Sequence, residues 1–377
     1  MRFFRPTFAE INLTNLESNY LSVRSLLPKG TGILAMVKAD AYGHGAVPIA
    51  QRLEGLHVDA FGVATVEEGV ELREAGIRSK ILVMGGLMGM GSPASWGMVR
   101  YGLTPVVHSA SILEDLDREA GKAGKKVEIH LKVDTGMTRL GLLPSSVEAL
   151  LSRLKDLRHL ELAGVMTHLA AAEDEAYASV QLERFSEVLA KVKNLVGVPI
   201  ILHLSNSAAI LRGLIKVDGF DKWWVRPGIA LYGGSPFAGA EEKMTFRPVM
   251  HIKSMVSLIK VVPDGTKVGY SCTYETRRRT KVGVVPIGYA DGYPLALSNK
   301  GIVLVGGIRL PVIGRVSMDM ITVDLTDADA HVGDEVVLLG EQGDERITVD
   351  ELALLAGTIS YELLCRVSKR MPRVYVG

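Results

Sequence analysis

The stretch ILAMVKADAYGHG (residues 33–45) places five apolar residues directly before Lys38 and follows the lysine with polar, aromatic and glycine residues. A short apolar, partly β-branched run indicates a buried strand, so the lysine is predicted to stand at the end of a strand. Seven more runs of this kind follow along the chain, and the set of eight decides the fold class. They are DAFGVA (59–64), KILVM (80–84), LTPVV (103–107), VEIHLKV (127–133), LAGVM (162–166), PIILHL (199–204) and KWWVR (222–226).

The gaps between these runs carry helical patterns. Apolar residues recur at helical spacing in two clear cases, Val147, Leu150, Leu151 and Leu154, then Leu182, Phe185, Leu189 and Val192. Near-continuous apolar strands that alternate with amphipathic helices indicate a parallel sheet covered by helices. Eight strands over roughly 200 to 250 residues favour a closed barrel over an open sheet. The sequence therefore predicts a (β/α)8 TIM barrel over residues 11–238.

The sequence pattern changes after Pro236. Segments rich in β-forming residues, separated by glycine, proline and aspartate turns, replace the alternation of strands and helices. We expect residues 239–377 to form a second, mostly β C-terminal domain, joined by the extended residues 1–10. Before the barrel, Thr14 and Glu17 stand at capping-box spacing, which predicts a helix that begins at Thr14.

Composition narrows the possible partners. The 377 residues contain 43 Lys and Arg against 42 Asp and Glu, so no charge excess favours nucleic acid or an anionic membrane. No apolar run reaches the roughly 18 residues of a membrane span, and the first residues lack a signal-peptide core. Cys272 and Cys365 lack metal-ligand spacing. We therefore expect a cytoplasmic protein with no metal site and a small-molecule substrate.

Chemistry in a barrel gathers where the strands end. The residues predicted there include Lys38, Lys132, Arg139, His168, His203 and Arg226. A lysine that is partly shielded from water at this position has a lowered pKa and is a usable nucleophile. The alternative is an ordinary lysine in an ion pair at a strand end, and the sequence leaves that alternative open.

A second signal lies at the last two predicted strands. Asn206 and Ser207 stand at a predicted helix start, and Gly228 lies in a glycine-containing turn, a region of barrels that often binds phosphate. Ser207 could also be a simple helix N-cap. A lysine nucleophile and a phosphate site on one rim together suggest pyridoxal 5'-phosphate.

Nine motifs occur along the chain in the same order as in a known enzyme family. They are AMVKADAYGHG, LKVDTGMTRLG, MTHLA, HLSNSAA, RPGIALYG, VGYSCTY, IGYADGYP, GRVSMDM and TISYELLCR. Over essentially its whole length the chain resembles the alanine racemases, a family of fold-type III pyridoxal-phosphate enzymes. The resemblance implies interconversion of L- and D-alanine by a homodimer, which supplies D-alanine for peptidoglycan.

The resemblance also implies roles for single residues. Lys38 would bond to the cofactor aldehyde, His203 would pack beside the cofactor ring, and Arg226 would face the ring nitrogen. An arginine stays charged and so keeps that nitrogen unprotonated, which makes the ring a weaker electron sink. The phosphate would be held near Asn206 by Tyr42, Ser207, Gly228, Ile229 and Tyr361.

Racemisation needs one acid–base group on each face of the substrate Cα. By resemblance these groups are Lys38 and Tyr270, the tyrosine coming from the second subunit, with His168 and Asp319 in its hydrogen-bond network. The substrate would be bound by Arg139, the backbone N–H of Met318 and Tyr289, and Lys132 matches a position that is carbamylated in many members. Without carbamylation, Lys132 would pair with an acidic residue.

Alternatives remain at this stage. The runner-up functions are a broad-specificity or serine racemase, a decarboxylase of the same architecture, and a non-catalytic pyridoxal-phosphate carrier. A decarboxylase would carry a glutamate in place of Arg226, and a carrier would lack the second domain. Ser271, Ser317 and Leu295 depart from the family pattern beside the expected pocket, which leaves rate and substrate range open.

Overall fold

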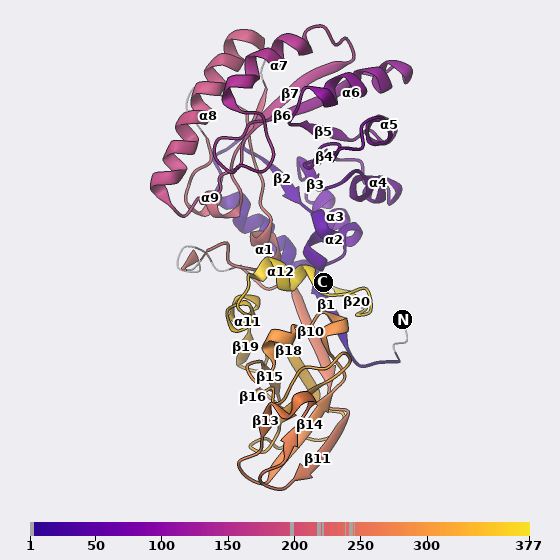
Figure 1. The fold of residues 1–377 in the computed structure, drawn as a ribbon, viewed down its shortest axis with the longest axis vertical. Coiled ribbons are helices and arrows are strands. Elements are labelled where there is room, and N and C mark those ends of the chain that lie inside the picture. The colour runs from indigo at the N-terminus through magenta and orange to yellow at the C-terminus, as the bar shows by residue number, and fades with distance from the viewer. Residues whose placement is uncertain are drawn as a thin grey trace.

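The first half of the chain forms a closed barrel of eight parallel strands. The computed structural model describes residues 4–196, 200–216, 220, 222–237, 239–240, 244 and 246–377. Strands β2 and β9 pair and close the barrel, which Figure 1 shows as the upper body of the molecule. The strands are β2 (Gly32–Met36), β3 (Ala60–Val63), β4 (Lys80–Val83), β5 (Thr104–Val107), β6 (Val127–Lys132), β7 (Leu160–Met166), β8 (Ile201–His203) and β9 (Trp223–Val225).

Each of the eight predicted runs overlaps a barrel strand, in the predicted order, so the predicted fold class is confirmed. Two details of the prediction fall on residues that are not described: residue 199, the first of the run PIILHL, and the domain boundary at residue 238. The strands are buried on both faces because helices cover the outside and side chains fill the inside, which explains their near-continuous apolar character.

The helices bury the predicted faces. Val147, Leu150, Leu151 and Leu154 are all buried in α7, and Phe185 is fully buried in α8. The barrel helices are α1 (Leu13–Ser25), α2 (Lys38–Gly43), α3 (Ala46–Gly55), α4 (Val66–Glu74), α5 (Ser92–Tyr101), α6 (Ser111–Lys122), α7 (Val147–Leu154), α8 (Glu175–Val196), α9 (Ser207–Leu211) and α10 (Ile229–Tyr232), with a short 3-10 turn at Pro144–Ser146.

The predicted start of the first helix is wrong. Helix α1 begins at Leu13, and its cap is Asn12, whose side chain accepts the N–H of Asn15 at 2.9 Å. Strand β1 (Phe8–Asn12) runs directly into this helix, so the end of the strand supplies the capping residue. The spacing of Thr14 and Glu17 forms no capping box here.

The C-terminal half is a separate set of sheets, drawn below the barrel in Figure 1. Strand β1 belongs to its largest sheet, where it lies between β10 and β20. The remaining elements are β10 (Met250–Met255), β11 (Leu258–Val262), β12 (Lys267–Val268), β13 (Tyr274–Glu275), β14 (Thr280–Val285), β15 (Ile302–Val305), β16 (Ile308–Pro311), β17 (Ile321–Asp324), β18 (Glu335–Gln342), β19 (Glu345–Ile347), α11 (Val349–Ala356), α12 (Ser360–Cys365) and β20 (Arg373–Val376), with 3-10 turns at Tyr270–Cys272, Tyr289–Asp291 and Leu295–Leu297.

The N-terminal segment is anchored to this second half by a buried carboxylate. Asp291 is fully buried and forms an ion pair with Arg5, whose guanidinium also donates to the carbonyl of Pro286 at 3.0 Å. A buried carboxylate is costly without such partners. The pair therefore ties the N-terminal segment to the second half of the chain.

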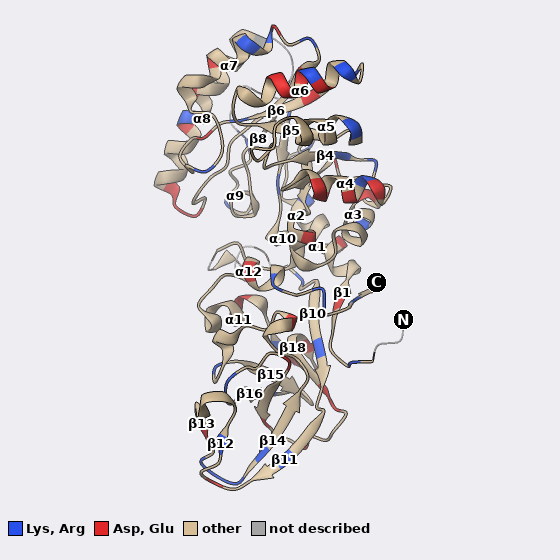
Figure 2. Ribbon diagram, turned by 45° about the vertical axis from the view of Figure 1, so that its right-hand side comes forward, with Lys and Arg blue, Asp and Glu red and all other residues tan. Residues whose placement is uncertain are grey.

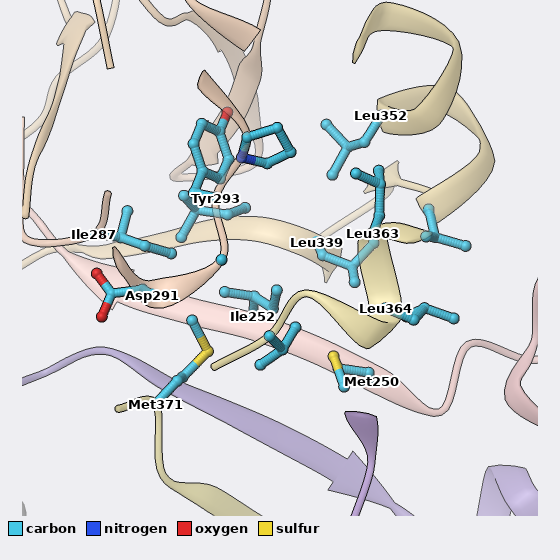
Figure 3. A pocket seen from close by; sticks show the side chains of 15 residues that line it. Met250, Ile252, Ile287, Asp291, Tyr293, Leu339, Leu352, Leu363, Leu364 and Met371 are labelled. Carbon is cyan, nitrogen blue, oxygen red and sulfur yellow. The ribbon is translucent and has the colours of Figure 1, made fainter. Parts of the chain in front are cut away.

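One cavity within the second half is small. It measures about 30 Å³ and lies between β10, β18 and α12. Figure 3 shows its wall, which is apolar at Met250, Leu339 and Leu363 and polar only at Asp291 and Tyr293. A space of this size has no room for a ligand larger than water. This cavity is a small packing gap rather than a ligand site.

Acidic residues outnumber basic ones on the outer helices α4 and α6, as Figure 2 shows, although the totals over the whole sequence are nearly equal. Among the described residues, no helix combines the length and the apolar character needed to cross a membrane.

Candidate active site

The ends of the barrel strands bring the predicted cationic and imidazole side chains together. Lys38 stands two residues beyond β2, His203 is the last residue of β8, and Arg226 directly follows β9. Lys132 is the last residue of β6, and His168 stands two residues beyond β7. Because parallel strands end on one rim, these five residues share the mouth of the barrel.

Lys38 is half-buried there, and its surroundings disfavour its charge. Burial lowers the pKa of Lys38 below its ordinary value of 10.5, and the positive charge of Arg139 lowers it further. Among the described residues no carboxylate lies within ion-pair distance of its amine, so the alternative of an ordinary ion pair is not observed. A larger fraction of the amine is therefore neutral and nucleophilic at neutral pH.

The backbone after Lys38 forms a left-handed turn. Four consecutive residues, Ala39 to Tyr42, have φ between 51° and 55°, and none of them is glycine. Each such residue costs roughly 1–2 kcal/mol, so the turn persists only where the rest of the structure holds it. It turns the chain back on itself and buries the Tyr42 side chain beside the barrel mouth.

Contacts on several sides hold this turn. The imidazole Nδ1 of His44 lies 3.0 Å from the carbonyl of Ala41 and 2.9 Å from that of Tyr42, so it carries a proton and donates. The Asp40 carboxylate accepts the N–H of Ala46 at 2.7 Å. From the C-terminal half, the guanidinium of Arg373 on β20 donates to the carbonyl of Gly43 at 3.0 Å. The second domain thus helps to fix the loop that carries the lysine.

Four of the predicted phosphate residues lie close together. The Ser207 hydroxyl accepts the N–H of Gly228 at 3.0 Å and that of Ala230 at 3.3 Å. A side chain at position 228 would clash with the hydroxyl of Tyr42, so the glycine makes room for that phenol. The Tyr361 ring lies 6.0 Å from the Tyr42 ring, centroid to centroid. Hydroxyls and backbone N–H groups in this arrangement suit a phosphate, and a Cβ would fill the space between them.

The helix start nearby differs from the predicted alternative. Asn206, not Ser207, is the N-cap of α9, and its side chain accepts the N–H of Ala209 at 2.9 Å. The Ser207 hydroxyl is left to face Gly228. Ile229 begins α10 and is buried, whereas Tyr361 lies on α12 of the second domain.

Arg226 is a buried cation without an acidic partner. Its guanidinium donates to the carbonyls of Thr167 at 2.8 Å and Leu204 at 3.0 Å, and it lies 3.1 Å from His168 Nδ1 and 3.2 Å from His203 Nδ1. No ion pair with a carboxylate occurs among the residues that the structure describes. Burial lowers the pKa of Arg226 to about 9, so it stays charged at neutral pH and can only donate hydrogen bonds.

Lys132 also lacks an ion pair within the described part of the chain. Burial and the nearby charges of Arg226 and Arg139 lower the pKa of Lys132 to about 8. The neighbouring Asp134 is occupied otherwise, because its carboxylate accepts three backbone N–H groups, at 2.9 to 3.1 Å, from the loop that leads to Arg139. Pairing of Lys132 with an acidic residue is therefore not what the structure shows.

The remaining predicted site residues lie on the second domain and face outward. Tyr270 is 71% exposed, Tyr289 43% and Met318 52%. Tyr289 and Met318 stand on adjacent loops, since the N–H of Tyr289 donates to the carbonyl of Ser317 at 3.0 Å. The Ser317 hydroxyl donates to the carbonyl of Met320 at 2.7 Å and so closes the loop that carries Met318. Asp319 on the same loop pairs with Arg370 at 2.6 Å.

Within one chain, Lys38 at the barrel mouth and Tyr270 on the second domain lie far apart. Tyr270 lies between β12 and β13, and Figures 1 and 2 place this hairpin at the far end of the second domain from α2, which carries Lys38. One chain therefore holds a buried half-site at the barrel mouth and an exposed half-site on the second domain.

Two more buried histidines lie near the site. His44 was expected to support the site through hydrogen bonds without direct chemistry, and its bonds to the left-handed turn agree with that expectation. His130 was not predicted as a site residue. His130 stands two residues before Lys132 on β6, and the two-residue period of a strand points both side chains to the same face. That period was the available signal.

A lysine with a lowered pKa beside a cluster of hydroxyl and backbone N–H groups at a barrel mouth, together with a second, mostly β domain, is the arrangement of the barrel-type amino-acid racemases, which are isomerases. The chain belongs to the alanine racemase family, because residues 11–236 match the family's N-terminal domain and residues 249–375 its C-terminal domain. It is 42% identical to the alanine racemase of Halothermothrix orenii and 41% identical to that of Geobacter sulfurreducens, covering 99% of this chain and 98% of each relative.

Solved structures agree with this assignment. The alanine racemase of the D-cycloserine producer Streptomyces lavendulae matches with a TM-score of 0.91 at 34% identity, covering 100% of this chain and 98% of that one. The alanine racemase of Bacillus anthracis, solved with bound L-Ala-P, matches with a TM-score of 0.90 at 31% identity, covering 100% and 96%.

Proposed function

We propose that this chain interconverts L- and D-alanine with pyridoxal phosphate, in a homodimer whose active sites are shared between subunits. The observation that supports this proposal most directly is the division of the site into a buried half with Lys38 and an exposed half with Tyr270. An exposed tyrosine at the far end of the same chain can act on this chemistry only in a second copy. A C2 dimer in which each subunit completes the other's site would satisfy both halves.

The residues at the barrel mouth fit the cofactor. Lys38 would hold its aldehyde carbon, and the cluster of Tyr42, Ser207 and Gly228 would hold its phosphate, joined by Ile229, Tyr361 and the backbone near Asn206. When bound, the group withdraws electrons from the substrate Cα and so acidifies its proton. Arg226 would face the ring nitrogen beside His203, and since an arginine only donates hydrogen bonds, it leaves that nitrogen without a proton.

Proton transfer is assigned to two side chains of this protein. Lys38, with its lowered pKa, would exchange the proton on one face of the substrate Cα. Tyr270 of the partner subunit would serve the opposite face, supported by His168 of the barrel and by Asp319. His168 Nδ1 faces the Arg226 guanidinium, so the proton of the neutral ring sits on Nε2. That N–H is then available as a donor to a phenolate.

The substrate carboxylate is assigned to Arg139 and to the backbone N–H of Met318, with Tyr289 narrowing the space for a methyl side chain. A guanidinium binds a carboxylate through two parallel hydrogen bonds, which suits this role. We further propose that Lys132 is carbamylated, because its lowered pKa leaves a neutral amine that can react with CO2. The resulting anion would orient Arg139 in place of the acidic partner that Lys132 lacks.

Two further points belong to the proposal. The domain division is placed at residues 11–238 and 239–377, with residues 1–10 joined to the second domain, and the position of β1 in the second domain's sheet supports that link. The proposed role is supply of D-alanine for peptidoglycan, and the cytoplasmic location stays a prediction.

The first test follows racemisation directly. Purified protein is incubated with L-alanine in deuterated water, and optical rotation and loss of the α-proton are recorded together. We expect the rotation to decay to zero while deuterium enters Cα. A protein that binds the cofactor yet changes neither signal would contradict the proposal and favour a carrier, whereas faster turnover of L-serine would favour a serine or broad-specificity racemase.

The shared site is tested by mixing two inactive variants, Lys38→Ala and Tyr270→Phe, under conditions that exchange subunits. Half of the dimers would be mixed, and each mixed dimer would hold one intact site of two, so about a quarter of the parent activity should return. Each variant exchanged with itself is the control. No recovery after proven exchange would show that the tyrosine does not cross between subunits.

A further inference from the structure

A layer of three rings fills the barrel beneath the proposed cofactor site. His130 Nδ1 lies 2.8 Å from His203 Nε2, and both histidines are fully buried. The Trp224 ring lies 6.0 Å from the His130 ring and 6.4 Å from the His203 ring, centroid to centroid. Nothing in the reaction described above uses His130.

The barrel is shaped to hold this layer. A Cβ at Gly164 on β7 would clash with the His130 ring, and a Cβ at Gly32 on β2 would clash with the Trp224 ring. Register pairs His130 directly with Gly164 across β6 and β7. A glycine in a strand interior weakens the strand, so its presence opposite His130 indicates that the room for this imidazole matters.

The hydrogen bonds in this layer can run in one direction only. Arg226 Nη1 lies 3.2 Å from His203 Nδ1, and because an arginine cannot accept, this nitrogen must carry the lone pair. A neutral His203 then has its proton on Nε2 and donates it to His130 Nδ1. His130 in turn carries its proton on Nε2. The reverse order would set the Nδ1–H of His203 against the N–H of Arg226.

The last nitrogen of this series of hydrogen bonds has no hydrogen-bond partner among the described residues. This nitrogen, Nε2 of His130, is buried. A buried polar atom without a partner is costly, and an apolar side chain of similar size would avoid that cost. Burial lowers the pKa of His130 to about 3, and burial with the charge of Arg226 lowers that of His203, so both rings are neutral at neutral pH.

We propose that His130 is a positioning residue, which holds His203 in its Nε2–H tautomer and thereby orients the Arg226 guanidinium through His203 Nδ1. The inference rests on the proposed function only in that Arg226 would face the cofactor ring. His130 touches neither substrate nor cofactor in this account, and it acts through two intervening side chains.

The direct test is the tautomeric state of the two rings in the purified holoenzyme, labelled with 15N-histidine. Two-bond 15N–1H correlation spectra distinguish a protonated from an unprotonated ring nitrogen, and the His130→Asn and His203→Asn variants assign the signals. We expect both His203 and His130 to be protonated on Nε2 alone. A proton on Nδ1 of His203 would overturn the proposal, and this measurement on the parent protein needs no variant to fold.

A matched pair of variants tests the role. In His130→Asn the amide oxygen can occupy the position of Nδ1 and accept from His203, whereas His130→Leu has similar bulk and no acceptor. We expect His130→Leu to weaken cofactor binding by about tenfold and to shift the absorption band of the bound cofactor, with His130→Asn restoring most of both. His331→Leu, at a position with a 72% exposed side chain, is the control.

The outcomes separate the two proposals. Equal losses in the leucine and asparagine variants, or no loss in either, would reduce His130 to a packing residue and overturn the inference. Failure of the parent protein to racemise alanine, with the tautomers as expected, would overturn the proposed function and leave the hydrogen-bonded chain standing.

Discussion

The barrel mouth and the outward face of the second domain prepare their chemistry in opposite ways. At the mouth, Arg226 and His203 are buried and linked by a hydrogen bond within one chain. On the second domain, Tyr270, Tyr289 and Met318 expose between 43% and 71% of their surfaces. A buried cation is held by four acceptors because none is available from water, whereas an exposed tyrosine gains its environment only when another surface covers it.

In the proposed enzyme, one chain therefore supplies cofactor binding and the nucleophile, while the second acid–base group depends on assembly. It also separates two kinds of variant. Changes at the mouth should alter what a single chain binds, and changes on the exposed face should alter turnover with binding retained.

The largest effect is expected for Lys38→Ala, which removes both the covalent anchor and one acid–base group. We expect racemisation to fall by about 10³-fold or more, together with the absorption band of the bound cofactor. Tyr270→Phe should lose about 10²- to 10⁴-fold of activity yet keep the cofactor band. Titration with pyridoxal phosphate and a racemisation assay check both, and equal loss of cofactor in the two variants would erase the proposed difference between the halves.

Gly228→Ala should weaken cofactor binding by about tenfold, since the new methyl group would displace the Tyr42 hydroxyl from the proposed phosphate cluster. The matched control is Gly55→Ala in helix α3, where a methyl group would meet open space. The control should leave binding unchanged and hold or slightly raise stability. Unchanged affinity in Gly228→Ala would argue that Tyr42 and Gly228 do not hold the phosphate.

The pH dependence of stability should report Lys132. Its pKa is about 8 in the folded chain and about 10.5 when unfolded, so between these values the unfolded chain binds the additional proton. Unfolding free energy should therefore rise with pH across this window, by roughly 3 kcal/mol at most, and Lys132→Met should lack that rise.

Urea denaturation of the parent protein and Lys132→Met at pH 8 and pH 10, in CO2-free buffer, measures this rise in unfolding free energy. Adding bicarbonate should abolish the rise, because a carbamylated lysine has no amine left to titrate. If the unfolding free energies of the two proteins changed equally between pH 8 and pH 10 without CO2, burial would not lower the pKa of Lys132.

The smallest effect is expected for Arg370→Ala, which breaks the surface pair with Asp319 and a longer contact, 3.6 Å, with the buried Asp291, whose pair with Arg5 remains. Both side chains are more than two-fifths exposed, so the unfolding free energy of an isolated chain should change by less than about 1 kcal/mol. A larger loss, specifically at protein concentrations that favour a dimer, would show that assembly buries this pair. Chemical denaturation over a hundredfold range of protein concentration distinguishes the two results.

Most residues of the barrel mouth could be predicted, because each one lies at or just after the end of a strand that the sequence pattern identifies. Each barrel strand ends on the same rim, so Lys38, Lys132 and Arg226 could be assigned to one site from their places after apolar runs. Ser207 was also placed correctly beside Gly228, although the helix cap proved to be Asn206. The helix start at Leu13 was missed because strand β1, which pairs far along the chain, supplies the cap.

The eight-stranded barrel, the mostly β second domain and the order of the chemical groups could be read from the sequence, because periodicity and apolar runs are properties of short stretches. The left-handed turn after Lys38, the acceptors around Arg226 and the hydrogen bonds from Arg226 through His203 to His130 became visible only in the folded structure. Each of these depends on atoms brought together from distant strands, and on a buried environment in which an unmet hydrogen bond is costly.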